Sequence, residues 1–181
     1  MKLGIAFPTN EIGNDPAQIR DFAQGAEDLG YDYMFLTDHV LQIQPDDHPG
    51  AFAPYTLDDP FHEPLVTIGF LAAVTEKIQL TTGILITPQR QTVLMAKQAA
   101  QADLLSGGRL RLGIGIGWQE IEFTALGEDF YNRGIRSEEQ VELMRALWMN
   151  KTAEFKGNWH HLPKSGFNPN SVQKPIPIWF G

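Results

Sequence analysis

Short apolar segments alternate along this sequence with segments that have the periodicity of amphipathic helices. An apolar strand in a parallel sheet is covered on both faces, so its residues need not alternate between polar and apolar. The repeat therefore predicts an α/β fold with helices packed on a parallel sheet. Strands are expected at residues 3–7, 33–36, 78–85, 110–116 and 176–180, and helices at 16–29, 64–74, 91–105, 119–126 and 137–149.

Two architectures share this repeat, a closed (β/α) barrel and an open, doubly wound sheet. The 181 residues are expected to form one domain in either case. Irregular segments at 41–62 and 152–174 interrupt the repeat, and the second contains a predicted hairpin around Gly157 and Asn158. Because sites are commonly built from loops that follow strands, 41–62 is a candidate lid or specificity loop.

Local signals predict where some helices begin and end. Asp15 followed by Pro16 is typical of a helix N-cap with proline at the first helical position, and Gly30 is a stop signal. Ser137 and Gln140 have capping-box spacing, which predicts a helix that begins at Ser137.

Charge and composition argue against several classes of partner. The formal net charge is -8, and the sequence has no dense Lys/Arg block, so nucleic acid is not an expected partner. The absence of cysteine excludes disulfides and thiolate metal sites, the histidines show no metal-ligand spacing, and no metal is expected. Without a signal peptide or an apolar stretch of about 20 residues, a cytoplasmic protein with no membrane contact is predicted.

Asp38 and His39 come directly after the second expected strand. Side chains at this point leave the carboxyl edge of a parallel sheet, and a histidine there can transfer protons near neutral pH. The carboxylate could orient the imidazole or accept a hydrogen bond from a ligand. An equally weighted alternative is that Asp38 caps a turn and that His39 is a packed loop residue.

Glycines mark the ends of the third and fourth expected strands. Gly113, Gly115 and Gly117 alternate up to Trp118, which allows close backbone approach to a ligand. The alternative, that these glycines make room for bulky neighbours inside a barrel, is slightly favoured by the residues alone. The dinucleotide fingerprint G-x-G-x-x-G would require glycine where Trp118 stands, which weakens a Rossmann-type dehydrogenase. Gly83, just before the branched Ile84, indicates a bulge or an unusual peptide.

As a set, six segments resemble the luciferase-like monooxygenase superfamily, and within it the branch of oxidoreductases that depend on the deazaflavin coenzyme F-420. The resemblance covers the whole chain. It rests on LGIAFP (3–8), TDH (37–39), TGIL (82–85), LSGGR (105–109), GIGIGW (113–118) and PIPIWFG (175–181).

The resemblance implies a (β/α) TIM-barrel fold with a cofactor ring across the strand ends, supported from behind by a cis peptide at Gly83–Ile84. Asp38 and His39 would contact the ring region or the substrate, with His39 as the proton donor or acceptor. Gly115 and Gly117 would allow the backbone to approach the cofactor beside Trp118. Sugar-phosphate dehydrogenases of the deazaflavin branch carry a glutamate near the position of Trp118, so their acid/base pairing does not transfer.

Only five of the eight strands of a complete barrel are expected here. The sequence is therefore interpreted as the N-terminal part of a longer barrel, truncated after strand five, that forms a homodimer or is completed by a C-terminal half. The predicted function is hydride transfer between a deazaflavin and a small organic substrate. The alternatives are an FMN-dependent monooxygenase, which uses reduced flavin and oxygen, and a non-catalytic flavin-binding subunit.

Overall fold

The computed structural model describes residues 1–181, and its centre is a parallel β-sheet. The strands are β1 (Gly4–Ala6), β2 (Tyr33–Leu36), β3 (Gln79–Thr82), β4 (Leu85–Ile86), β5 (Leu110–Gly115) and β8 (Ile178–Phe180). β1, β2, β3 and β5 are neighbours in that order, and β4 and β8 also pair with β5, all in parallel. The predicted α/β class with a parallel sheet is confirmed.

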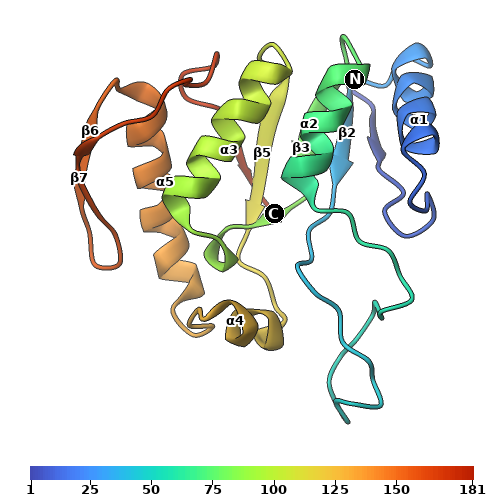
Figure 1. Cartoon of the computed structure of the whole chain (residues 1–181), viewed down its shortest axis with the longest axis horizontal. Helices are drawn as coiled ribbons and strands as arrows, with labels where there is room; N and C mark the ends of the chain where they lie inside the picture. The colour runs from blue at the N-terminus through green and yellow to red at the C-terminus, as the bar shows by residue number, and fades with distance from the viewer.

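The four long helices lie on one face of this sheet (Figure 1). They are α1 (Pro16–Asp28), α2 (Pro64–Val74), α3 (Thr92–Leu105) and α5 (Arg133–Met149). A doubly wound sheet has helices on both faces, so that alternative is wrong. The strands also do not close into a barrel, because β1 and β8 do not pair. No helix combines the length and apolarity needed to cross a bilayer.

The two faces of the sheet are covered differently. Along β2, Met34 and Leu36 are buried in the main hydrophobic core, whereas Tyr33 and Phe35 are only half-buried. Successive side chains in a strand point to opposite faces, so Tyr33 and Phe35 belong to the face without helices. Trp179 on β8 forms an edge-on contact with Tyr33 there and is also only partly covered. This face is aromatic and accessible.

The strand expected at 78–85 is interrupted. A cis peptide bond at Gly83–Ile84 separates β3 from β4, at the position implied by the family resemblance. Thr82 faces Gly113 across the interruption and donates from Oγ1 to its carbonyl oxygen over 2.6 Å. β3 pairs with the beginning of β5 and β4 with its end, so the break redirects the chain without removing it from the sheet.

The capping box predicted at Ser137 and Gln140 is wrong. Helix α5 begins at Arg133, so both residues lie inside it. Both are buried against the short 3-10 helix η1 (Thr87–Gln89), where the Ser137 hydroxyl lies 2.9 Å from Thr87 Oγ1. The Gln140 amide donates to the carbonyl oxygens of Thr87 and Arg90. Tertiary contacts, not helix capping, therefore explain these polar residues.

Three other local predictions are confirmed. The Asp15 side chain accepts a hydrogen bond from the Ala17 N–H at the start of α1, and Gly30 after this helix has a φ of +84°. The hairpin consists of β6 (Ala153–Lys156) and β7 (His161–Ser165). Its turn is held by buried Glu139 of α5, which accepts hydrogen bonds from the N–H groups of residues 158–160 and from His160 Nδ1.

Glu139 makes the stability of this fold sensitive to acid. Burial acts to raise the pKa of Glu139, but hydrogen bonds from Asn158, His160 and Trp159 outweigh it and hold the pKa below 4.5. The ionised carboxylate therefore stabilises the fold above its unfolded-state pKa, and this contribution is lost as the pH falls through the folded-state pKa. We expect Glu139→Gln to cost about 1 kcal/mol at pH 7 and less at pH 3.

Urea unfolding at pH 7, 5, 4 and 3 measures this difference. Glu138→Gln is the matched control, because its exposed side chain lies next to Glu139 on the same helix. An unchanged pH dependence of the unfolding free energy in Glu139→Gln would contradict the assignment.

Candidate active site

A pocket of about 550 Å³ lies at the carboxyl ends of the parallel strands. All the site residues predicted from the sequence line it, although they come from three separate stretches of the chain. The lining consists of Thr37, Asp38, His39, Phe52, Pro54, Tyr55, Gly83, Ile84, Ile86, Gly115, Ile116, Gly117, Trp118 and Gly181. The structure thus brings together the residues after β2, the cis peptide and the end of β5.

Glycines shape one side of this pocket. A Cβ on Gly115 would lie 2.6 Å from Cδ1 of Ile84, so this glycine gives room to the residue after the cis peptide. Gly117 has a φ of +74°, and a Cβ there would lie 2.7 Å from Cγ2 of Ile86. At Gly115 the room for a bulky neighbour is confirmed, and close approach of its backbone to a ligand stays a prediction.

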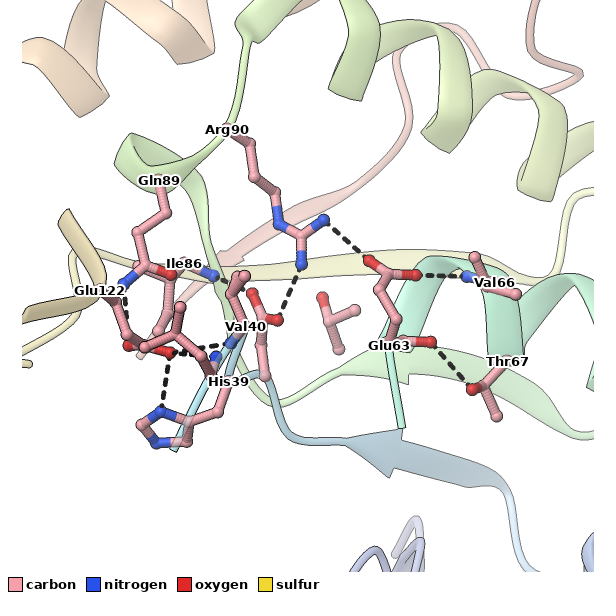
Figure 2. A network of polar contacts seen from close by, with 12 residues as sticks. His39, Val40, Glu63, Val66, Thr67, Ile86, Gln89, Arg90 and Glu122 are labelled. Atoms are coloured by element: carbon pink, nitrogen blue, oxygen red, sulfur yellow. Dashed lines mark hydrogen bonds and ion pairs between the residues drawn. The ribbon is translucent and has the colours of Figure 1, made fainter. Parts of the chain in front are cut away.

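His39 is held by a buried carboxylate that the sequence analysis did not identify. Glu122 lies on α4 (Glu120–Leu126), and its side chain has no exposed surface. Its Oε1 lies 3.2 Å from His39 Nδ1 and accepts from the N–H groups of Val40 and Leu41 over 2.8 and 3.2 Å. Its Oε2 accepts from the Gln89 side chain over 2.9 Å (Figure 2).

These hydrogen bonds fix the charge of Glu122. Burial acts to raise the pKa of Glu122, but the hydrogen bonds from His39, Gln89 and Leu41 outweigh it, and the pKa lies below its ordinary value. An ionised carboxylate can only accept, so His39 Nδ1 carries the proton in this contact. Nε2 is then the ring nitrogen that can accept or donate a proton at the pocket.

Asp38 takes part in a second buried network. Its Oδ2 accepts from the Ile86 N–H over 2.9 Å, and its Oδ1 pairs with Arg90 Nη2 over 2.8 Å. Arg90 also binds Glu63, the N-cap residue of α2, over 2.7 Å (Figure 2). Burial opposes the charge of Arg90, but the carboxylates of Asp38 and Glu63 raise its pKa above the ordinary value. The two terminal nitrogens of the guanidinium pair with these two acids, whereas its buried Nε has no hydrogen-bond partner.

The Asp38 carboxylate has no exposed surface in this arrangement. It joins the end of β2 to β4 through the Ile86 N–H. Arg90 pairs with Asp38 before residues 40–62 and with Glu63 after them, so it connects the two ends of this loop, called loop 40–62. Direct contact between this carboxylate and a cofactor ring stays a prediction. The geometry favours a positioning role, in which Asp38 fixes the backbone that carries His39.

Loop 40–62 and Trp118 build an aromatic wall around His39. The ring centroids of Tyr55, Phe61 and Trp118 lie 5.4, 5.1 and 5.6 Å from that of the imidazole. Phe52 packs on the outer side of Trp118 at 5.3 Å. The loop and α4 extend from the same end of the sheet (Figure 1). Phe52, Pro54 and Tyr55 of this segment line the pocket, and the role of residues 41–62 as a lid or specificity loop stays a prediction.

Sequence reasoning missed Glu122, Gln89 and Arg90. Glu122 lies between Ile121 and Phe123 in an expected polar helix, and a carboxylate with apolar neighbours was the only available signal. Its contact with His39 joins residues 83 positions apart, and no local pattern predicts such a contact.

The whole chain, residues 1–181, matches the family model described as luciferase-like monooxygenase. The chain belongs to this family. An F420-dependent glucose-6-phosphate dehydrogenase of Kineococcus radiotolerans is 31% identical over 183 residues, which cover 99% of this chain and 50% of that protein.

Solved structures share the fold. Monooxygenase RslO1 from Streptomyces bottropensis matches with a TM-score of 0.81 and 25% identity, over 99% of this chain and 53% of that one. An F420-dependent secondary alcohol dehydrogenase, solved with an F420-acetone adduct, matches with a TM-score of 0.76 and 23% identity. The match covers 99% of this chain and 52% of that one. The chain thus spans about half the length of each of these proteins.

Proposed function

We propose that this chain provides the ring-binding site of an oxidoreductase that moves a hydride between a deazaflavin and a small organic substrate. The observation that carries the proposal is His39, held by ionised Glu122 with Nε2 free, at a pocket lined by glycine backbone. Relatives named as F420-dependent dehydrogenases support the choice of cofactor.

The lining of the pocket fits a planar, uncharged ring. Gly83, Gly115, Gly117 and Gly181 present backbone without side chains, and Ile84 and Ile86 add apolar surface. No Lys or Arg lines the pocket, so its chemistry suits the ring of the cofactor and not its phosphate. When bound, a deazaflavin supplies the acceptor or donor of the hydride.

His39 supplies the proton transfer that accompanies hydride movement. In the oxidation of an alcohol, a bound deazaflavin would supply the hydride acceptor, and Nε2 of His39 would take the hydroxyl proton. Ionised Glu122 stabilises the resulting imidazolium through Nδ1. In the opposite direction the imidazolium returns this proton to the carbonyl oxygen. Asp38, bound to the Ile86 N–H and to Arg90, holds the end of β2 before His39. Glu122 binds the N–H groups of Val40 and Leu41 and so holds the backbone after it.

A flavin monooxygenase is the second candidate, because the family and the structural neighbour RslO1 are described as monooxygenases. The same pocket would then hold the ring of reduced FMN. Titration with deazaflavin and with FMN, followed by oxygen uptake, tests both. Binding of FMN alone, with oxygen consumption, overturns the deazaflavin proposal.

Gly117 offers a test that does not need turnover. We expect Gly117→Ala to weaken deazaflavin binding by about tenfold or more, because the new methyl group would displace Ile86 at the pocket. Gly127→Ala is the matched control, since Gly127 has a similar φ of +72° but an open surrounding. Both variants carry the strain of a positive φ. Equal affinities in a fluorescence titration of the two variants would contradict the proposed ring position.

We further propose that the sheet is part of a (β/α) barrel, completed by further strands or by a second copy of the chain. The partly exposed aromatic face with Tyr33, Phe35, Trp179 and Phe180 supports this, as does coverage of about half of each barrel relative. Sedimentation velocity tests it for the 181-residue chain. A compact monomer with tight deazaflavin binding would overturn the need for completion.

A further inference from the structure

A second pocket, of about 580 Å³, shares no lining residue with the pocket at His39. It lies between α3, α5 and the turn of the β6–β7 hairpin. α3 and α5 lie side by side, and the hairpin packs on the outer side of α5 (Figure 1). Thr92, Gln140 and His160 each come from a different one of these elements and line the pocket together. The chemistry proposed at His39 uses none of these three residues.

Thr92, His160 and Glu139 form a chain of hydrogen bonds at this pocket. His160 Nδ1 lies 2.8 Å from Oε1 of Glu139, and His160 Nε2 lies 2.7 Å from Oγ1 of Thr92. The ionised Glu139 carboxylate can only accept, so in the neutral imidazole Nδ1 carries the proton and Nε2 accepts. The Thr92 hydroxyl therefore donates its hydrogen to Nε2. Hydrolases with a nucleophilic hydroxyl have the same order of hydroxyl, base and orienting carboxylate.

Buried Gln140 fixes the Thr92 hydroxyl and also has an unused acceptor. Its Nε2 donates to Thr92 Oγ1 over 2.9 Å, which leaves the hydroxyl hydrogen directed to His160. Nε2 also donates to the carbonyl oxygens of Thr87 and Arg90, so the orientation of the amide is set. Oε1 of Gln140 has no hydrogen-bond partner, although the residue is only 1% exposed. An unpaired buried acceptor is costly, which favours a bound molecule that donates a hydrogen bond here.

The first turn of α3 supplies donors for a negative charge that develops beside Thr92. Thr92 is the first residue of this 14-residue helix, and no side chain caps the helix. The backbone N–H groups of Val93 and Leu94 have no hydrogen-bond partner, and both residues line the pocket. In hydrolases whose nucleophile lies where a helix begins, the N–H of the next residue stabilises the oxyanion. Val93 has this position relative to Thr92.

The rest of the lining indicates the class of substrate. Val93, Leu94 and Trp159 are partly exposed and contribute apolar surface next to the polar groups. A short acyl chain fits against these side chains while its carbonyl group lies at Thr92 and at the first N–H groups of α3.

We propose that this second pocket hydrolyses esters of short carboxylic acids, with Thr92 as the nucleophile and His160 as its general base. Oγ1 of Thr92 bonds to the carbonyl carbon, and its proton moves to Nε2 of His160. The bond to the alcohol oxygen then breaks, and the alcohol leaves with that proton. Water attacks the acyl-threonine by the same steps, which releases the carboxylic acid and restores the hydroxyl. Glu139 is a positioning residue, and it stabilises the imidazolium through Nδ1.

A fluorophosphonate probe tests the nucleophile without the deazaflavin. Attack by an activated hydroxyl forms a P–O bond and releases fluoride, and mass spectrometry of the digested chain locates the adduct. We expect a single adduct, at Thr92, that Thr92→Ser retains and Thr92→Val abolishes. Thr67→Val is the matched control. Thr67 is also buried near the start of a helix, but its hydroxyl donates to a backbone carbonyl oxygen.

His160→Gln tests the general base. It should slow both the labelling of Thr92 and the hydrolysis of p-nitrophenyl acetate by about 10²-fold, the lower end of the usual contribution of general base catalysis. His161→Gln is the matched control, because this neighbouring histidine is exposed on β7 and should leave both rates unchanged. Circular dichroism shows whether each variant keeps the fold.

An adduct at another residue, or no adduct at all, overturns the proposed nucleophile. The position of the adduct is determined in the chain without substitutions, so this outcome does not depend on the folding of Thr92→Val. Labelling of Thr92 at an unchanged rate in His160→Gln overturns the role of His160 as the base. Labelling without hydrolysis of p-nitrophenyl acetate overturns the esterase activity.

Discussion

His39→Asn is expected to lower turnover of an alcohol substrate by about 10²- to 10⁴-fold, the usual contribution of general acid–base catalysis. Asparagine can still donate a hydrogen bond toward Glu122, in place of His39 Nδ1, but it has no equivalent of Nε2. The substrate hydroxyl then loses its proton acceptor. Steady-state kinetics with saturating deazaflavin measures the effect, and urea unfolding shows that the fold is retained. Unchanged turnover would remove His39 from the mechanism.

Glu122→Gln separates the role of the charge from that of the imidazole. The imidazolium form of His39 would lose its buried ionic partner, so turnover should fall by at least about tenfold and the acidic limb of the pH–rate profile should move to lower pH. Gln89→Leu is the control, because it removes one hydrogen bond to Glu122 without removing the charge. A pH profile identical to that of the unmodified chain would leave Glu122 with a purely structural role.

Gly113→Ala is expected to destabilise the fold by about 3 kcal/mol or more. A Cβ at this position would lie 2.0 Å from the carbonyl oxygen of Thr82, which is backbone and cannot rotate away. To remove this overlap, β5 would have to move away from the segment around the cis peptide. The free energy of unfolding in urea, monitored by circular dichroism, measures the loss.

Two alanine variants test that explanation. At Gly115 the nearest atom to a new Cβ is the flexible end of the Ile84 side chain, so Gly115→Ala should destabilise less than Gly113→Ala. Gly25 lies in α1 with nothing within 4 Å, so Gly25→Ala should stabilise by about 0.5 to 1 kcal/mol. If Gly113→Ala lowers the free energy of unfolding by no more than Gly115→Ala does, crowding against the Thr82 backbone is not the cause of the destabilisation.

Much of the candidate site could be predicted from strand ends alone. Parallel strands place their carboxyl ends at one edge, so residues after β2, around the cis peptide and at the end of β5 had to meet there. Hence Asp38, His39, Gly83, Ile84, Gly115, Gly117 and Trp118 all line one pocket. The resemblance to a known family also located the cis peptide, which local periodicity could not show.

The error at Ser137 and Gln140 has a clear physical origin. Capping-box spacing is a local pattern, and the same residue types satisfy it when they form tertiary hydrogen bonds. Here both side chains bind groups of η1 about 50 residues away. Local signals gave the correct result at Asp15, where the cap is exposed and has no competing tertiary partner.

The sequence by itself determined the class of the fold, the edge of the sheet that carries the site and the presence of His39 there. Periodicity and the order of the elements are local properties, and parallel pairing converts them into a common edge. Only the tertiary structure decided which groups control His39 and Asp38. The contacts of Glu122 with His39 and of Arg90 with Asp38 join residues 83 and 52 positions apart. Such partners depend on packing and burial, because a buried charge must find its counterpart wherever the chain brings one.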